Sequence, residues 1–149
     1  MQLRNLVLVL LTVAACRSAP SNPGSAGAPL PGAAAPRAAV EGFLAAVRAQ
    51  DLQAMSSVWG SERGPAREII SDRAELEKRE LVMQCYLSHD RFRILEETPG
   101  DGPARVFRVE LTKGSLTRAT KFTTVPGPSN RWYMREADLE PVKDLCASR

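Results

Sequence analysis

Apolar residues at helical intervals predict two helices at the start of the folded region. The first helix has Pro36 in its opening turn, a position that suits proline. Its apolar residues recur every three or four positions, at Val40, Phe43, Leu44 and Val47. Asp51 is a good N-cap for a second, short helix. The apolar residues of that helix are Leu52, Met55, Val58 and Trp59, and Gly60 ends it.

A third helix is predicted after a loop at Gly64-Pro65. Asp72 and Glu75 stand three residues apart, which is the spacing of a capping box. Glu75 and Arg79 stand four apart and can pair on the solvent side, worth roughly 0.2–0.5 kcal/mol. The apolar side of this helix is predicted to consist of Leu76, Leu81, Val82, Cys85 and Tyr86.

From Arg91 onward the pattern alternates with a period of two, which predicts strands. Turns are predicted at 98–103, at Lys113-Gly114 and at 126–130. The apolar residues that alternate with polar ones are Phe92, Ile94, Phe107, Val109, Leu111, Trp132 and Met134, and a Thr-rich strand covers 116–125. Because the connections are short, successive strands are expected to be antiparallel neighbours. The pattern therefore predicts an α+β fold with three N-terminal helices and about four antiparallel strands.

The first residues form a different kind of segment. Arg4 precedes an apolar stretch that is too short to span a bilayer, as in a secretory signal peptide over 1–15. The stretch ends in Val13-Ala14-Ala15-Cys16, which resembles the lipobox of bacterial lipoproteins. The resemblance implies cleavage before Cys16 and acyl chains on that cysteine, enough for stable anchoring. The alternative is an ordinary secretory signal in which Cys16 is incidental.

This resemblance implies a location in the cell envelope, facing the periplasm. Residue 17 is arginine rather than aspartate, which favours the outer membrane in a Gram-negative organism. Residues 16–36 are nearly all Ala, Gly, Pro or Ser and predict a flexible tether. A recognition segment for a proline-binding partner is the alternative. The folded domain is assigned to residues 37–149.

Charge and cysteine content narrow the classes of function. The formal net charge of the 149-residue chain is +3, and its arginines are interleaved with acidic residues, which argues against nucleic-acid binding. Cys85 and Cys146 are left as a pair once Cys16 is lipidated, and an oxidising compartment favours a disulfide between them over two free thiols. Two cysteines and one histidine lack metal-ligand spacing, so neither a metal nor a cofactor is expected.

The order of elements resembles the nuclear transport factor 2-like superfamily, which includes ketosteroid isomerases and SnoaL-like proteins. The segments that carry the resemblance are 40–47, 51–55, Val58-Trp59 and 131–134, within residues 37–140. It implies a cone-like fold, in which the three helices pack on a curved antiparallel sheet with a pocket between them. Members of this superfamily include enzymes and non-catalytic binding modules, so the fold does not assign a function.

Few residues are candidates for chemistry. His89 and Asp90 could act as a base and its orienting partner, although neighbours on a strand point to opposite faces and the segment also has the character of a polar turn. Trp59, Tyr86 and Tyr133 could line a pocket, but the favoured alternative makes Trp59 a plug of the core and the two tyrosines its edge, with their hydroxyls in water. The arginines and lysine of the strands could line an anion groove, but a solvated sheet face paired with Glu96, Glu97, Glu110 and Glu136 is favoured.

These features favour a non-catalytic envelope lipoprotein that binds a small apolar or amphiphilic ligand or a protein partner. The first alternative is a cone-pocket enzyme, isomerase- or hydrolase-like, that uses His89 and Asp90. The second is a structural or assembly lipoprotein whose sheet face docks a partner through a broad apolar patch.

The lipobox leads to a direct prediction about the mature protein. Protein extracted from membranes should have the intact mass of residues 16–149 plus acyl chains, and Cys16→Ser should leave the chain unacylated. Mass spectrometry of both forms measures this. An unacylated wild-type chain that still contains residues 1–15 would contradict the lipoprotein assignment.

Overall fold

Helix α1 (Pro36–Ala49) lies closest to the sheet in the computed structural model, which describes residues 30–147. Pro36 occupies its first turn as predicted, and the helix ends at Gln50. The left-handed backbone of Gln50 (φ 55°) directs its N–H to the carbonyl oxygens of Ala46 and Val47. The predicted apolar face is confirmed, because Val40, Phe43, Leu44 and Val47 are all buried.

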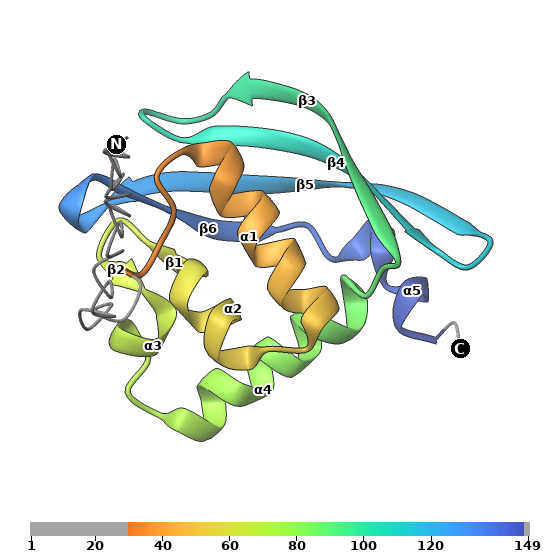
Figure 1. The fold of residues 1–149 in the computed structure, drawn as a ribbon, viewed down its shortest axis with the longest axis horizontal. Helices are drawn as coiled ribbons and strands as arrows, with labels where there is room; N and C mark the ends of the chain where they lie inside the picture. The colour runs from red at the N-terminus through yellow and green to blue at the C-terminus, as the bar shows by residue number, and fades with distance from the viewer. Residues whose placement is uncertain (1–29, 148–149) are drawn as a thin grey trace, which may run out of the picture.

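Four antiparallel strands form a meander in the order β3 (Arg91–Pro99), β4 (Arg105–Lys113), β5 (Leu116–Gly127) and β6 (Arg131–Ala137). The sheet curves around α1, and the four helices that precede it in the chain lie on its concave side (Figure 1). Phe107 pairs with Phe122 across β4 and β5, and both side chains point to α1 and are fully buried. The α+β class and the four antiparallel strands are therefore as predicted.

The number and placement of the helices differ from the prediction. In addition to α1, α2 (Leu52–Val58) and α4 (Arg73–Tyr86), the described residues form two helices of one turn, α3 (Ala66–Ile69) and α5 (Asp144–Ala147). A short hairpin of β1 (Gly60–Ser61) and β2 (Gly64–Pro65) replaces the predicted loop. One-turn helices are not stable alone and have no periodic signal, so only tertiary contacts form them. Two 3₁₀ turns, Pro128–Asn130 and Glu140–Val142, complete the elements.

The last residues of the predicted tether are bound to the sheet. Ala33 exchanges two backbone hydrogen bonds of 2.8 Å with Trp132 at the edge of β6. The Arg131 guanidinium donates to the carbonyl oxygens of Pro31 and Gly32 at 3.2 and 2.7 Å. The folded unit therefore begins before Pro36. Cys16 and the predicted leader lie outside the described residues.

Helix α4 faces the core with a different side from the one its sequence predicts. The Asp72 cap is as predicted, because its carboxylate accepts hydrogen bonds from the N–H groups of Ala74 and Glu75, but the Glu75 carboxylate accepts from Arg79 and does not complete the capping box. Glu75 then pairs with Arg79 at 2.7 Å, as predicted. The buried side chains of α4, however, are Glu80 and Met83, while Leu81 and Val82 are 47 % and 42 % exposed. The predicted apolar side is therefore wrong for these two residues.

The rotation of α4 is explained by one stripe of side chains. Met83 and the following Leu87 enter the core cluster, and Glu80 lies one turn before Met83 on the same side of the helix. Glu80 is 3 % exposed, and its Oε1 has no hydrogen-bond partner. Burial raises the pKa of Glu80, and the neighbouring Ser56 on α2 offsets only part of that effect. The helix thus buries a carboxyl group and exposes two aliphatic side chains.

The space between helices and sheet is filled rather than hollow. Fully buried side chains from the helices and the strands pack together there in one core, which includes Phe43, Leu44, Met55, Phe107, Leu111, Phe122 and Met134. The pocket that the family resemblance implies would occupy this space, and these side chains fill it. None of the helices in residues 30–147 is long and apolar enough to cross a membrane.

The C-terminal segment is fastened to the domain at several points. Cys85 of α4 and Cys146 of α5 lie at disulfide distance, with their Cα atoms 4.7 Å apart. Leu145 and Val142 are fully buried, and Arg118 of β5 pairs with Asp144. The expected cysteine pairing is therefore present, and it joins positions 61 residues apart.

The disulfide should contribute strongly to stability. For a loop of this length the chain-entropy model gives roughly 4 kcal/mol, so Cys85→Ala with Cys146→Ala should lower the unfolding free energy by about that amount. Urea unfolding of the variant and of wild type, with and without a reductant, measures the loss. Wild type whose unfolding midpoint does not respond to the reductant would contradict this contribution.

Glu80→Gln should stabilise the protein at neutral pH. A carboxyl whose pKa is raised by folding contributes stability below its unfolded pKa and loses it as the pH rises through its folded pKa. The wild type should therefore lose stability relative to Glu80→Gln as the pH rises from about 4 to 7. Urea unfolding across this range measures the difference, with Glu77→Gln on the exposed side of α4 as the control. Parallel pH profiles for wild type and Glu80→Gln would refute the assignment.

Candidate functional site

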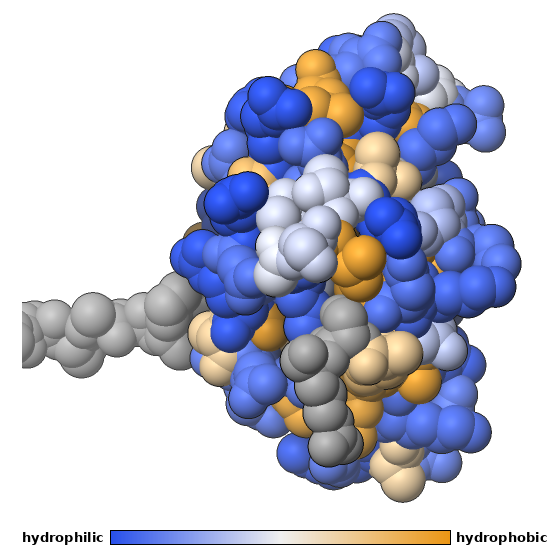
Figure 2. Space-filling view, turned by 90° about the vertical axis from the view of Figure 1, so that its right-hand side faces the viewer, coloured by the Kyte–Doolittle hydropathy of each residue, from blue (hydrophilic) through white to orange (hydrophobic). Residues whose placement is uncertain are grey.

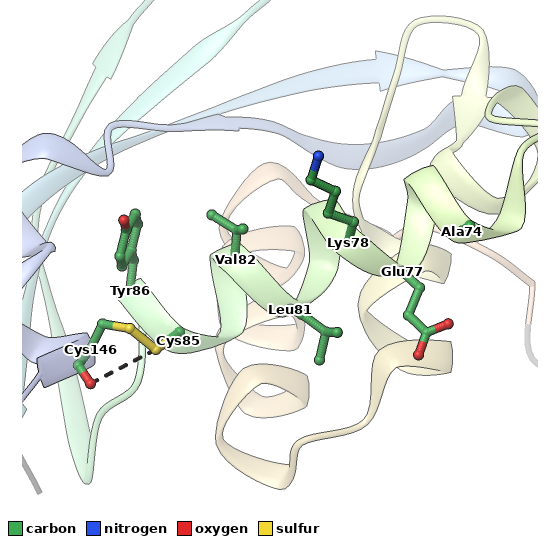
Figure 3. A pocket seen from close by; sticks show the side chains of 8 residues that line it. All are labelled: Ala74, Glu77, Lys78, Leu81, Val82, Cys85, Tyr86 and Cys146. Carbon is green, nitrogen blue, oxygen red and sulfur yellow. Dashed lines mark hydrogen bonds between the residues drawn. A yellow bond between two sulfur atoms is a disulfide. The ribbon is translucent and has the colours of Figure 1, made fainter.

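The outer face of α4 is the strongest candidate site in the described chain. Its apolar part consists of Leu81, Val82, Cys85 and Tyr86, and we call these residues the α4 outer face. They line an open hollow of about 520 Å³ together with Ala74, Glu77, Lys78 and Cys146. Figure 3 shows two rows of side chains on the helix, with Lys78, Val82 and Tyr86 on one side and Glu77 and Leu81 on the other. The N-terminal half of the face is thus charged and the C-terminal half is apolar.

A cluster of hydrogen bonds holds the C-terminal segment beside this face. The Lys113 ammonium donates to the Ser88 hydroxyl at 2.9 Å and to the Leu145 carbonyl at 2.6 Å, and the Ser88 hydroxyl donates to the same carbonyl at 3.1 Å. A serine beside a lysine is also the chemistry of a nucleophile and its base. Here the lysine donates its protons to both partners, so the group acts as a structural clamp on α5.

Two smaller hollows border Trp59, and both are also lined by Arg79 of α4. One has a volume of about 240 Å³, with an apolar floor of Trp59, Ile69 and Ile70. The other has a volume of about 260 Å³, and its apolar walls are Trp59, Val82, Met83 and Leu139. Trp59 and Arg79 line both, so we treat them as one feature, the Trp59 groove. Lys78 and Val82 belong both to this groove and to the hollow over the α4 outer face.

Cationic side chains surround the Trp59 groove. Arg135 pairs with Glu62 at 2.9 Å, and Arg79 pairs with Glu75. Neither Arg63 nor Lys78 has an ion pair within residues 30–147, and both are exposed. Glu75 is the single acidic residue that lines the groove. The groove therefore combines an apolar floor with an excess of positive charge at its rim.

The structure does not bring His89 and Asp90 together as a base and its orienting partner. The His89 ring is 6 % exposed, its Nδ1 lies 2.8 Å from the Leu87 carbonyl oxygen, and its edge packs on Phe92 with ring centroids 5.7 Å apart. Its Nε2 is buried with no hydrogen-bond partner, and burial lowers the pKa of His89, which favours the neutral ring. Asp90 is exposed and accepts a hydrogen bond of 2.7 Å from the Gly114 N–H. The two side chains have separate structural roles.

The three aromatic pocket candidates have different environments. Trp59 and Tyr86 are half-buried and line the outer hollows described above. Tyr133 is buried, and burial raises its pKa. Its ring passes so close to Gly32 and Gly127 that a Cβ on either would lie within 2.9 Å of it. Tyr133 therefore fixes the start of the domain to the sheet and borders only a hollow of about 200 Å³.

The cations of the strands mostly have partners within the domain. Arg93 pairs with Glu110 at 3.1 Å and Arg105 pairs with Glu97 at 2.9 Å, both across β3 and β4. Arg91, Arg108 and Lys121 have no ion pair among the described residues, but Glu96 is the register partner of Arg108. The mixed charges of this face agree with a solvated sheet surface rather than an anion groove.

Sequence patterns alone did not identify the Trp59 groove or the exposure of α4. One signal was available: Leu81 and Val82 fall on a different side of the helix from Met83 and Leu87, so the four cannot all face one core. Which pair is buried depends on α2 and the sheet. Within residues 30–147 no group of three or more His, Cys, Asp or Glu side chains could hold a metal ion.

Comparisons of this chain with protein-family models, with curated proteins and with solved structures found no match.

Proposed function

We propose that this protein is a non-catalytic binding module of the cell envelope, anchored by lipid on Cys16, that takes up the apolar part of a small amphiphilic ligand. The observation that carries the proposal is the orientation of α4. Leu81 and Val82 lie open to solvent beside Tyr86 while the same helix buries Glu80. A helix that exposes aliphatic residues and buries a carboxyl gives up hydrophobic stabilisation. Packing of Met83 and Leu87 in the core sets this orientation, and we assign the outer face that it exposes to ligand binding.

The size of the apolar surface favours a small ligand over a broad protein interface. Exposed large hydrophobic residues in the described chain are limited to Leu30, Leu81 and Val82. The face of the molecule in Figure 2 has hydrophobic residues in small, separate areas within a hydrophilic surface. None of the three exposed residues lies on β3, β4, β5 or β6, where the assembly hypothesis places its broad apolar patch. The filled interior and the separate roles of His89 and Asp90 leave the enzyme hypothesis without a site there.

The α4 outer face should bind a neutral apolar probe. Leu81→Ser with Val82→Ser should weaken the binding of Nile red to the purified chain at least about fivefold, because both side chains contribute apolar contact area. Fluorescence titration measures this. The fold should be retained, since both side chains are exposed in the free protein.

Leu30→Ser is the matched control, because Leu30 is 68 % exposed and lies away from α4. It should leave the Nile red affinity unchanged. Absence of probe binding to wild type, or an equal loss with Leu30→Ser, would overturn the proposed function.

A further inference from the structure

The Trp59 groove is built for a ligand that spans both of its hollows. At about 240 and 260 Å³, each hollow is smaller than the 300–1,000 Å³ of usual small-molecule sites. Trp59 and Arg79 line both hollows, so an elongated ligand that lies across these two side chains contacts both. Lys78 and Val82 then continue the path onto the α4 outer face. This shape fits a chain-like ligand.

The positive charge of the groove favours a ligand with an anionic head group. The first hollow is bordered by Arg63, Arg79 and Arg135 and has no acidic lining residue. Arg79 and Arg135 are each neutralised by a glutamate, whereas Arg63 has no ion pair among the described residues. A guanidinium that is free to form bidentate hydrogen bonds recognises a carboxylate or a similar anion. Trp59, Ile69 and Ile70 line the same hollow and suit an alkyl chain.

The position of the groove relates it to the predicted anchor. The described chain begins at Leu30 and Pro31, which border Pro65 and Glu68 at α3. Ala66 and Ile69 of the same short helix line the first hollow of the Trp59 groove. Figure 1 shows α3 and the start of the described chain at one end of the molecule, with α5 at the other. The predicted anchor would therefore join the domain at the end of the molecule that carries the groove.

We propose that the Trp59 groove binds a single-chain anionic amphiphile of the long-chain carboxylate class, with its head at Arg63 and its alkyl chain over Trp59 and Val82. This inference rests on the proposed function, because it names the ligand of the same binding module. It adds a charge selectivity that the apolar face by itself does not require.

The test compares three probes that share a twelve-carbon chain: laurate, dodecyl maltoside and dodecyltrimethylammonium, each as monomer. Titrations use the chain with Trp132→Phe, so that Trp59 is the one remaining tryptophan and reports on the groove. Laurate should change the Trp59 fluorescence and bind about tenfold tighter than the cationic probe. Arg63→Gln with Lys78→Gln should abolish this preference, because it removes the two groove cations that have no ion pair among the described residues. Neither change leaves an acidic partner unpaired, so the fold should be retained.

Arg91→Gln with Arg108→Gln is the matched control. It removes the same charge from the sheet surface, where neither residue has an ion pair within residues 30–147, and it should keep the preference for laurate. Equal losses in the two double variants would show only a general effect of net charge and would overturn the inference. Binding to phosphatidylglycerol vesicles without binding to monomeric laurate would also overturn it, in favour of a membrane-surface contact.

The two proposals can fail separately. If Nile red binds and responds to Leu81→Ser with Val82→Ser but the three probes bind equally, the carboxylate inference is wrong and the binding module stands. If neither Nile red nor laurate binds, both are wrong.

Discussion

The packing of α1 against the concave side of the sheet is the interaction on which the rest of the domain depends. Phe43, Leu44 and Val47 are buried in one core cluster with Phe107, Leu111 and Phe122 of β4 and β5. Protein interiors are packed at crystal-like density, so a ligand site inside would require smaller side chains at several of these positions. The candidate binding surfaces lie on the outside of the helical layer, where α2, α3 and α4 meet.

The orientation of α4 follows from the same core. Met83 of α4 and Leu87 at its C-cap pack in the core cluster. Because Glu80 lies on the same side of the helix as Met83, this packing also buries Glu80. The link between Cys85 and Cys146 and the clamp of Lys113 on Leu145 hold the end of α4 against α5. The outward side then presents Leu81, Val82 and Tyr86 beside Lys78. An apolar surface with nearby positive charge is a direct consequence of how this helix is fastened.

The tertiary structure gives the candidate residues from the sequence different surroundings from those that their positions in the chain suggest. His89 and Asp90 are neighbours in the chain, but the turn between α4 and β3 sends the histidine into the core and the aspartate to the β4–β5 hairpin. Trp59 was expected as a plug of the core or as a pocket residue, and it forms the common wall of two hollows. Arg63, Arg79 and Arg135 come from the β1–β2 turn, α4 and β6, so no sequence spacing could have grouped them.

The sequence by itself determined the elements whose signal is local and repeated. The apolar period of α1, the Asp51 and Asp72 caps, the Glu75–Arg79 pair and the strand alternation all depend on neighbours within a few residues. Only the tertiary structure decided which side of α4 is buried, how residues 31–35 join β6, and that α3 and α5 form at all. These features depend on contacts between residues far apart in the chain. A pattern of hydrophobic residues indicates that a surface can be buried. Whether another element covers that surface or it stays exposed is decided by packing between distant parts of the chain.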